Sequence, residues 1–436
     1  MKRLAGLVIG TALSALGTSE AYAQSAFGCT NLSNQRHVAS VEGQAGVFYR
    51  VNPDLHMHHP FSDQSVAQVA ELGRALQELG TTLVYVPLPT KSLAMPRYLT
   101  SEAEDFGFDP DLATTVYKDA IKRLNEAGVL AVDARRAVIN ASAENPAFFK
   151  TDHRLTGFGA QLVAQAIAEK MRGDASFAGV PQGRFVSAPT APVILDSDMR
   201  NRLQQHCLVN LPPVETMAFA TTKSAAAAVA SSTSLFANTA RSARMAIVGT
   251  EYTSTPGINF AGFLSEFTGL DAVQYSVEDG GAFAAISSYM TSEAFQVERP
   301  KYLIWENPIY NNLGQFGDQP MRELIAAAGN TCRVPVNVLL SSDPNRLRVD
   351  LGSLDPSLSY TLFLDADGAA SDKARFTFFK RDGQTRTKTV YRHENQVRTG
   401  RFYMPVSGLW ADGAAAVDIE LGVPFGGNPR VTACFF

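Results

Sequence analysis

The chain has 436 residues, of which 45% are hydrophobic and 18% are charged, an ordinary composition for a globular protein. This length exceeds what one hydrophobic core usually organises, so we expect two or three domains. The formal net charge of −4 indicates no partner by itself, and we expect no nucleic-acid partner.

The first element predicted along the chain is a secretory signal over residues 1–23. Lys2 and Arg3 precede an apolar run that ends in the small-x-small triplet Ala21-Tyr22-Ala23. The alternative is a membrane anchor, but the run is shorter than the ~20 residues that span a bilayer. We therefore expect export, with Gln24 as the first mature residue.

The four cysteines lie in the part of the chain that we expect to be exported. An even number of cysteines in an oxidising compartment predicts two disulfides. Of three possible pairings we favour Cys29 with Cys207 and Cys332 with Cys434, because each would close one domain. No Cys-x-x-Cys or Cys-x-x-His spacing supports a metal site, and we expect neither a metal nor another cofactor.

Helix and strand patterns alternate from residue 65 onward. Apolar residues at helical spacing predict helices over 65–80, 110–128 and 155–171. Apolar runs predict strands over 81–90 and 129–135. This repeat of helix and strand indicates an α/β fold with a doubly wound parallel sheet.

Two later apolar runs, 244–249 and 300–308, predict further strands of the same sheet. Ligands of such sheets bind beyond the carboxyl ends of the strands, where Glu251 and Lys91 would lie. Lys91 would contact an anionic substrate there or be merely solvated. The intervening alanine-rich segment, 223–240, is compatible with a helix or with a flexible flap.

The pattern changes after about residue 331. Short strand-like runs are separated by Gly, Asp, Asn and Ser over 337–344, 346–352, 360–367, 375–383, 389–394, 401–408 and 417–425. Such spacing predicts a small all-β sandwich. We therefore divide the mature chain into an α/β domain over 24–330 and a β domain over 331–436.

The β domain contains a basic segment. Between residues 373 and 401, nine basic residues stand against two acidic ones, and aromatic residues interleave with them. The basic residues are Lys373, Arg375, Lys380, Arg381, Arg386, Lys388, Arg392, Arg398 and Arg401. They form either a basic face for a polyanion such as a polyuronate or an ordinary solvated sheet face. Trp410 is a candidate platform for a sugar ring, or a core residue.

Asp152 and His153 directly precede the helix predicted over 155–171. These residues supply two members of an Asp-His-Ser triad, in which the histidine takes the proton of the nucleophile and the aspartate orients the imidazole. The alternative is that Thr151 or Asp152 merely caps the helix.

Six runs together resemble the AlgX/AlgJ family of alginate O-acetyltransferases. The runs are VEGQAGVFYR (41–50), DLHMHHPFSD (54–63), TTLVYVPLPTKSLAMPRYL (81–99), FFKTDHRLTGFGA (148–160), AIVGTEYT (246–253) and the stretch from NFAGFLSEFTG through PKYLIWENP (259–308). The resemblance implies a periplasmic SGNH-hydrolase-like domain, a C-terminal carbohydrate-binding module and two disulfides. The implied partners are an anionic exopolysaccharide and other proteins of polysaccharide acetylation or export.

The chain departs from the family pattern at two of three catalytic positions. The family element Asp-Thr-His-Trp-Thr-Pro falls on residues 152–157, so that Asp152 matches the aspartate and Arg154 replaces the histidine, with His153 one residue early. The element Gly-Thr-Ser-Tyr-Ser falls on residues 249–253, so that Glu251, followed by Tyr252, replaces the nucleophile.

These replacements put catalysis in doubt. An arginine is not a general base at neutral pH, and an anhydride formed on Glu251 would hydrolyse readily. We expect Arg154 to form an ion pair with Glu251, and the protein to bind a polysaccharide or a partner. The alternatives are an O-acetyltransferase or a carbohydrate esterase that uses His153 as its base and Thr250, Thr253 or Ser254 as its nucleophile.

Overall fold

The computed structural model describes residues 25–57, 59, 61–224, 244–329 and 331–435. The predicted signal segment and most of the alanine-rich segment 223–240 lie outside these residues. Among the residues that are described, no helix combines the length and the apolar character needed to span a bilayer.

A five-stranded parallel sheet forms the centre of the first domain, in the order β4-β3-β9-β7-β8. The strands are β3 (Thr82–Leu88), β4 (Leu130–Ala131), β7 (Arg244–Gly249), β8 (Asp271–Ser276) and β9 (Tyr302–Pro308). The central strands are almost continuously buried, as expected where both faces of a parallel sheet are covered. The prediction of a doubly wound α/β domain is confirmed.

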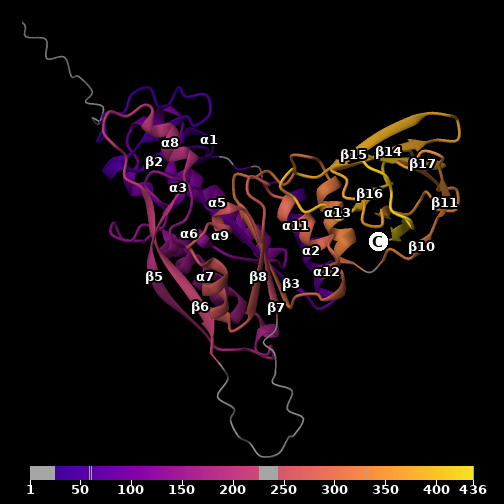
Figure 1. Ribbon diagram of the computed structural model, residues 1–436, viewed down its shortest axis with the longest axis horizontal. Coiled ribbons are helices and arrows are strands. Elements are labelled where there is room, and N and C mark those ends of the chain that lie inside the picture. The colour runs from indigo at the N-terminus through magenta and orange to yellow at the C-terminus, as the bar shows by residue number, and fades with distance from the viewer. Residues whose placement is uncertain (1–24, 58, 60, 225–243, 330, 436) are drawn as a thin grey trace, which may run out of the picture.

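Two groups of helices cover the sheet (Figure 1). The first comprises α6 (Ala134–Val138), α7 (Gly157–Arg172) and α10 (Phe260–Thr268). The second comprises α2 (Asp63–Gln77), α5 (Pro110–Glu126), α11 (Ala284–Met290) and α13 (Gln319–Ala328). The helix predicted from residue 65 starts two residues earlier, because the side chain of Ser62 caps it by accepting a hydrogen bond from the Ser65 amide.

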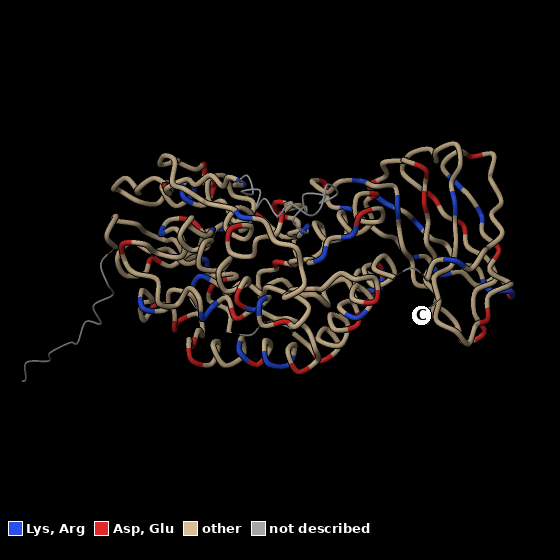
Figure 2. The backbone as a smooth tube through the Cα atoms, turned by 90° about the horizontal axis from the view of Figure 1, so that it is seen from below, with Lys and Arg blue, Asp and Glu red and all other residues tan. Residues whose placement is uncertain are grey.

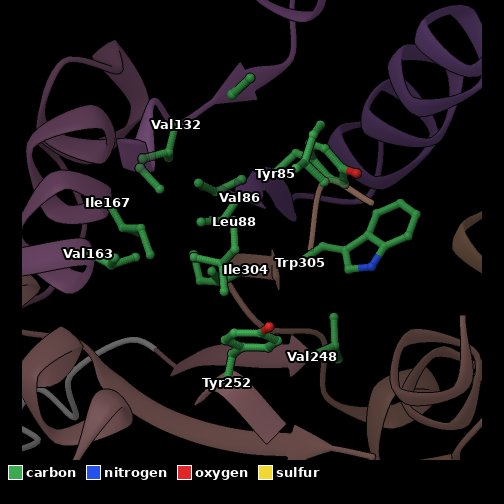
Figure 3. Packing of buried hydrophobic residues seen from close by; sticks show 14 of the residues in the cluster. Tyr85, Val86, Leu88, Val132, Val163, Ile167, Val248, Tyr252, Ile304 and Trp305 are labelled. Atoms are coloured by element: carbon green, nitrogen blue, oxygen red, sulfur yellow. The ribbon is translucent and has the colours of Figure 1, made fainter. Parts of the chain in front are cut away.

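Side chains alternate across the strands and fill the space under both helix groups. Figure 3 shows Val163 and Ile167 of α7 pointing toward Ile304, while Trp305 points to the other side of the sheet. There Trp305 packs edge-on against Tyr85 of the neighbouring strand, with 5.2 Å between the ring centroids.

Further short elements surround this core. The short helices are α1 (Val51–Asp54), α3 (Lys91–Ala94), α4 (Glu102–Asp105), α8 (Asp198–Gln204), α9 (Glu251–Ser254) and α12 (Glu293–Val297). A small sheet pairs β1 (Ser40–Glu42) with β2 (Phe48–Arg50), and a long ribbon pairs β5 (Phe185–Leu195) with β6 (Val214–Lys223). The sequence analysis did not predict this ribbon, which packs against α7 and α10.

The second domain is a sandwich of two antiparallel sheets, as predicted, in the orders β10-β18-β13-β16 and β11-β12-β17-β14-β15. Its strands are β10 (Val334–Pro335), β11 (Asn337–Leu340), β12 (Arg346–Asp350), β13 (Tyr360–Asp365), β14 (Lys373–Phe379), β15 (Thr385–Tyr391), β16 (Arg401–Pro405), β17 (Ala416–Leu421) and β18 (Arg430–Phe435). Alternate residues, such as Phe376 and Phe378, point into a core separate from that of the first domain.

Both predicted disulfides are confirmed: Cys29 is bonded to Cys207, and Cys332 is bonded to Cys434. The second disulfide ties the last strand, β18, to the segment that follows α13. Because it joins the two ends of the sandwich domain, it restricts the unfolded chain over about a hundred residues.

A buried ion pair joins the two domains. Arg392 of the sandwich donates to the carboxylate of Glu323 on α13, with 2.7 Å between Nη1 and Oε2. Glu323 also accepts a hydrogen bond from the Tyr403 amide, and Gln396 donates to Ser287 on α11. The loop between β15 and β16 is therefore fixed to the helices of the first domain.

Candidate active site

Glu251 lies at the carboxyl edge of the parallel sheet, where the sequence placed it. Strand β7 ends at Gly249, Thr250 caps α9, and Glu251 is the first residue of this helix. A Cβ atom at Gly249 would collide with the carboxylate of Glu306. Glycine therefore leaves room for the Glu306 side chain behind the turn.

Asp152 is buried in the loop before α7. Its carboxylate accepts hydrogen bonds from the Arg154 amide, from Nε and Nη2 of Arg154, and from Oγ of Ser197 at 2.6 Å. Burial raises the pKa of Asp152, but the hydrogen bonds from Arg154 and the positive charges of His153 and Arg154 outweigh it and hold the pKa well below the usual range. Asp152 is therefore a carboxylate at neutral pH.

The expected ion pair between Arg154 and Glu251 is wrong. The Arg154 guanidinium folds back onto Asp152 and donates to the Asp196 carbonyl oxygen, and it makes no contact within 4 Å to Glu251. His153 faces Glu251 instead, with 3.4 Å between Nε2 and Oε1. Adjacent side chains in this irregular loop point to different sides, so matching Arg154 to the family histidine by sequence position does not determine which of the two residues faces Glu251.

The imidazole of His153 is not held by Asp152. Its Nδ1 lies 3.7 Å from Oδ1 of Asp152 and is a buried atom without a hydrogen bond to any residue that the structure describes. The ring packs edge-on against Tyr252, with 5.5 Å between centroids. Because Arg154 and Ser197 already occupy the carboxylate of Asp152, the aspartate orients these two residues rather than the histidine.

The carboxyl group of Glu251 is ionised at neutral pH. Burial raises its pKa, but the hydrogen bond and charge of His153, with the backbone amides of Glu251 and Asp279, lower it below the ordinary value. The side chain is 16% exposed, so the carboxylate lies at the mouth of the site. The position thus presents a negative charge where a hydroxyl was expected from the family pattern.

The three hydroxyl groups considered as substitute nucleophiles do not contact His153. Oγ1 of Thr250 bonds to Glu306, while the hydroxyls of Thr253 and Ser254 donate to the Thr250 carbonyl oxygen. Both threonine side chains are buried. Their hydroxyls thus serve the turn itself and do not face the imidazole.

Glu306 lies directly behind the turn and was not identified from the sequence. It is 1% exposed on β9, and its Oε2 accepts a hydrogen bond of 2.7 Å from the Thr250 amide. Burial raises the pKa of Glu306 to about 8, and the charge of Glu251 adds to this shift. An acidic residue directly after the apolar run of residues 302–305, still within the predicted strand, was the signal that could have identified it.

A second polar network supports the site and was also missed. Arg50 forms an ion pair with the buried carboxylate of Asp54 and donates to the Tyr252 hydroxyl at 3.1 Å. The guanidinium also lies over the ring of Tyr310, 5.5 Å from its centroid. These contacts fix Tyr252, the ring against which His153 packs.

Lys91 is not exposed to solvent, so its predicted role in polymer binding is wrong. Its ammonium group is buried and donates to the backbone carbonyl oxygens of Phe48, Lys150 and Asp152. Three acceptors satisfy all three donors of the lysine. The cation instead joins the segments that carry Arg50 and Asp152.

The basic residues of the segment 373–401 do not form one continuous basic face. Figure 2 shows acidic residues between the basic ones on the sandwich, and Arg375 lies opposite Glu420 in the strand register. Arg392 is buried against Glu323, and Arg401 pairs with Asp365 and donates to the Thr291 carbonyl oxygen. Contrary to the prediction, buried Arg392 is therefore a structural contact and not a polymer-binding residue, whereas Arg401 remains partly exposed beside Asp365.

Other candidates of the β domain remain accessible. Arg381 and Trp410 line one pocket of about 380 Å³ at the end of the sandwich, together with Lys380. Arg386 lies over the Trp410 ring at 5.1 Å from its centroid. Lys388 and Arg398 are exposed.

Within the described ranges, no three His, Cys, Asp or Glu side chains are arranged to hold a metal ion. The site is thus built from an Asp152–Arg154 pair, a His153–Glu251 contact and a buried carboxyl group behind the turn. It has the placement of a catalytic centre without a hydroxyl or thiol against the imidazole.

Comparison with known proteins covers most of the chain. A family model described as "SGNH hydrolase-like domain, acetyltransferase AlgX" matches residues 41–309. The alginate biosynthesis protein AlgX of Pseudomonas aeruginosa is 31% identical over 275 residues, which are 63% of this chain and 56% of that protein. The probable alginate O-acetylase AlgJ of Pseudomonas putida is 28% identical over 287 residues, 64% of this chain and 71% of the relative.

The chain thus matches a little over half of the length of the first of these relatives. Solved structures show the same fold: that of Pseudomonas aeruginosa AlgX has a TM-score of 0.76 at 24% identity and covers 94% of this chain and 99% of its own. The O-acetyltransferase domain of Pseudomonas putida AlgJ has a TM-score of 0.50 at 22% identity and covers 66% of this chain and 98% of its own.

Proposed function

Since the chain belongs to the AlgX/AlgJ family of SGNH hydrolase-like proteins, we propose that it serves the biosynthesis of an alginate-like exopolysaccharide. In this proposal it binds the polymer, or a partner protein of acetylation or export, and does not transfer acetyl groups. Curated relatives are named for alginate biosynthesis and O-acetylation. The predicted signal over residues 1–23 and the two disulfides support a periplasmic location.

The observation that carries this proposal is the carboxylate of Glu251 at the first position of α9. Acetyl transfer through a serine requires a hydroxyl within reach of a base. Here the imidazole of His153 faces a carboxylate oxygen of Glu251, with 3.4 Å between Nε2 and Oε1. Arg154 is engaged by Asp152 and remains protonated, so it does not replace a general base.

The pocket at the end of the sandwich supports polymer binding. Trp410 offers an aromatic wall, and Arg381 offers a cationic group that suits the carboxylate of a polyuronate, while Lys380 is paired with Asp382 and Asp412. Arg398 adds an exposed cation on the loop that contacts the first domain.

The test combines transfer and binding measurements on the whole protein. We expect no acetylated product, detected by mass spectrometry, after incubation with p-nitrophenyl acetate and a mannuronate oligomer. We expect calorimetric binding of the oligomer that weakens in Arg381→Ala and Trp410→Ala. Oligomer binding that is absent in the wild type would refute polymer binding, and an acetylated product would refute the absence of acetyl transfer.

A second candidate is an O-acetyltransferase or carbohydrate esterase that works with substitute groups. The placement of His153 against Glu251 favours it, because a base stands at the turn. Turnover that survives in Glu251→Ala but is lost in His153→Ala would establish this alternative. Turnover lost in neither variant would come from elsewhere in the preparation.

A further inference from the structure

A small pocket lies at the carboxyl end of α8, at the end of the first domain opposite the sandwich (Figure 1). Side chains of residues 32–38 and of residues 202–206 form its walls. Its volume is about 140 Å³. Since one water molecule occupies about 30 Å³ in the liquid, this is the space of roughly four or five waters. The pocket therefore fits a small charged group with part of a sugar ring, and not a whole oligomer.

The two walls of this pocket are fixed to each other. The disulfide of the first domain joins them, and the Thr30 amide donates to the His206 carbonyl oxygen at 2.9 Å. Leu32 and Leu203 line the pocket and are buried in one apolar cluster. The pocket is thus formed without a ligand, so a ligand does not need to order the loop when it binds.

Every ionisable side chain among the lining residues is basic. They are Arg36, His37, Arg202 and His206, and none of the described lining residues is acidic. Arg202 pairs with Asp198 of α8 at 2.6 Å, whereas no carboxylate of the described residues lies within 4 Å of the Arg36 guanidinium. Because a concave surface lined by one sign of charge concentrates its electric field, this pocket attracts an anion, although the whole chain is negatively charged.

Helix α8 connects this pocket with the candidate site. Ser197 caps the helix, and its hydroxyl donates to the carboxylate of Asp152 at 2.6 Å. The preceding carbonyl oxygen, that of Asp196, accepts a hydrogen bond from Arg154. Since α8 contains seven residues, its two ends are about 10 Å apart. The pocket therefore lies within reach of an oligomer that is bound at the candidate site.

We propose that this pocket is an anion subsite of the first domain, in which Arg36, with the imidazoles of His37 and His206, binds one carboxylate of the polyuronate. This inference rests on the proposed polymer binding and adds a second place of contact to it. A guanidinium can bind a carboxylate through two parallel hydrogen bonds, and an imidazole can donate another. Along the long axis of the molecule, α9 lies between α8 and the sandwich (Figure 1). The polymer would thus be held on both sides of the Glu251 turn.

The experiment uses calorimetry on the full-length protein with two ligands, a mannuronate oligomer and the same oligomer with its carboxyl groups reduced to alcohols. We expect Arg36→Gln to weaken binding of the charged oligomer about threefold, and Arg36→Gln combined with His206→Gln to weaken it about tenfold. Arg36→Lys keeps the charge and should bind within about twofold of the wild type. Affinity for the reduced oligomer should not change in any of these variants.

Two controls accompany these variants. Arg74→Gln removes an exposed arginine on α2, away from the pocket, and should bind both oligomers like the wild type. The midpoint of urea unfolding, unchanged from the wild type, shows that each variant is folded. Inorganic phosphate, titrated at constant ionic strength, is a further probe, because a phosphate group would suit the same cations.

Three outcomes overturn the subsite while the proposed function stands. The first is a double variant that binds the charged oligomer like the wild type, while Trp410→Ala weakens it. The second is an equal loss of affinity for both oligomers, because the pocket would then not bind a carboxylate. The third is phosphate binding that requires Arg36, with oligomer binding that does not. A wild-type protein that binds neither oligomer instead refutes the proposed polymer binding itself.

Discussion

Replacing Glu306 by glutamine should make the protein more stable, and increasingly so as the pH rises. The folded protein retains the proton of this buried carboxyl group up to a pH of about 8, whereas the unfolded chain releases it near the ordinary pKa of 4.5. Between these values the folded state binds more protons, so stability falls as the pH rises.

The magnitude follows from the separation of the two pKa values. Each pH unit between them is worth about 1.4 kcal/mol, so the raised pKa of Glu306 lowers the free energy of unfolding by about 3 kcal/mol at pH 7 and by about 5 kcal/mol above pH 8. Glutamine carries no such cost. Its amide oxygen can accept from the Thr250 amide, and its amino group can donate to Oγ1 of Thr250, so both contacts of the carboxyl group are kept.

The assay is urea unfolding at several pH values from 5 to 9 with the disulfides intact. The chain has two tryptophans. A Trp410→Phe background therefore leaves the buried Trp305 of β9 as the fluorescence reporter for the first domain. The quantity to compare is the free energy of unfolding of the Glu306→Gln protein minus that of the parent at each pH.

We expect this difference to grow by several kcal/mol between pH 5 and pH 8 and then to level off. A difference that stays constant over this range would refute the reasoning, because Glu306 would then titrate alike in both states. Glu251→Gln provides a control. Removing the charge of Glu251 lowers the pKa of Glu306, so the stability of a Glu251→Gln protein that keeps Glu306 should stop falling at a lower pH than that of the parent.

Two further predictions concern the domain junction and the turn. Glu323→Ala should lower the free energy of unfolding in urea by about 3–5 kcal/mol, because Arg392 would remain buried without its partner. Replacing both Glu323 and Arg392 by alanine should cost less than the sum of the two single replacements, and additive costs would contradict this reasoning. Glu251→Ser should gain hydrolysis of p-nitrophenyl acetate that depends on His153. The activity should be weak, because a serine Oγ would lie about 2 Å farther from the imidazole than the carboxylate oxygen does. Adding Arg154→His should reduce that activity, and a double variant faster than the single one would show that residue 154 supplies the base.

The sequence by itself determined the architecture. Runs such as 82–88 and 302–308 are apolar enough to predict buried parallel strands, and glycine-bounded helical patterns between them predict the covering helices. The alternation after residue 331 predicted the sandwich, and the even number of cysteines, with one pair assigned to each domain, predicted both disulfides. The position of Glu251 followed from the same reasoning, because the end of an apolar strand marks the edge of the sheet.

Side-chain direction and burial were decided only by the tertiary structure. The sequence could not determine whether His153 or Arg154 faces Glu251, because consecutive residues of an irregular loop point to different sides. Their partners, Asp196 and Glu251, lie far away along the chain. Lys91 looks like a surface cation in the sequence, yet three carbonyl oxygens from distant segments bury it. Such contacts join residues separated by many positions, so local pattern carries no record of them.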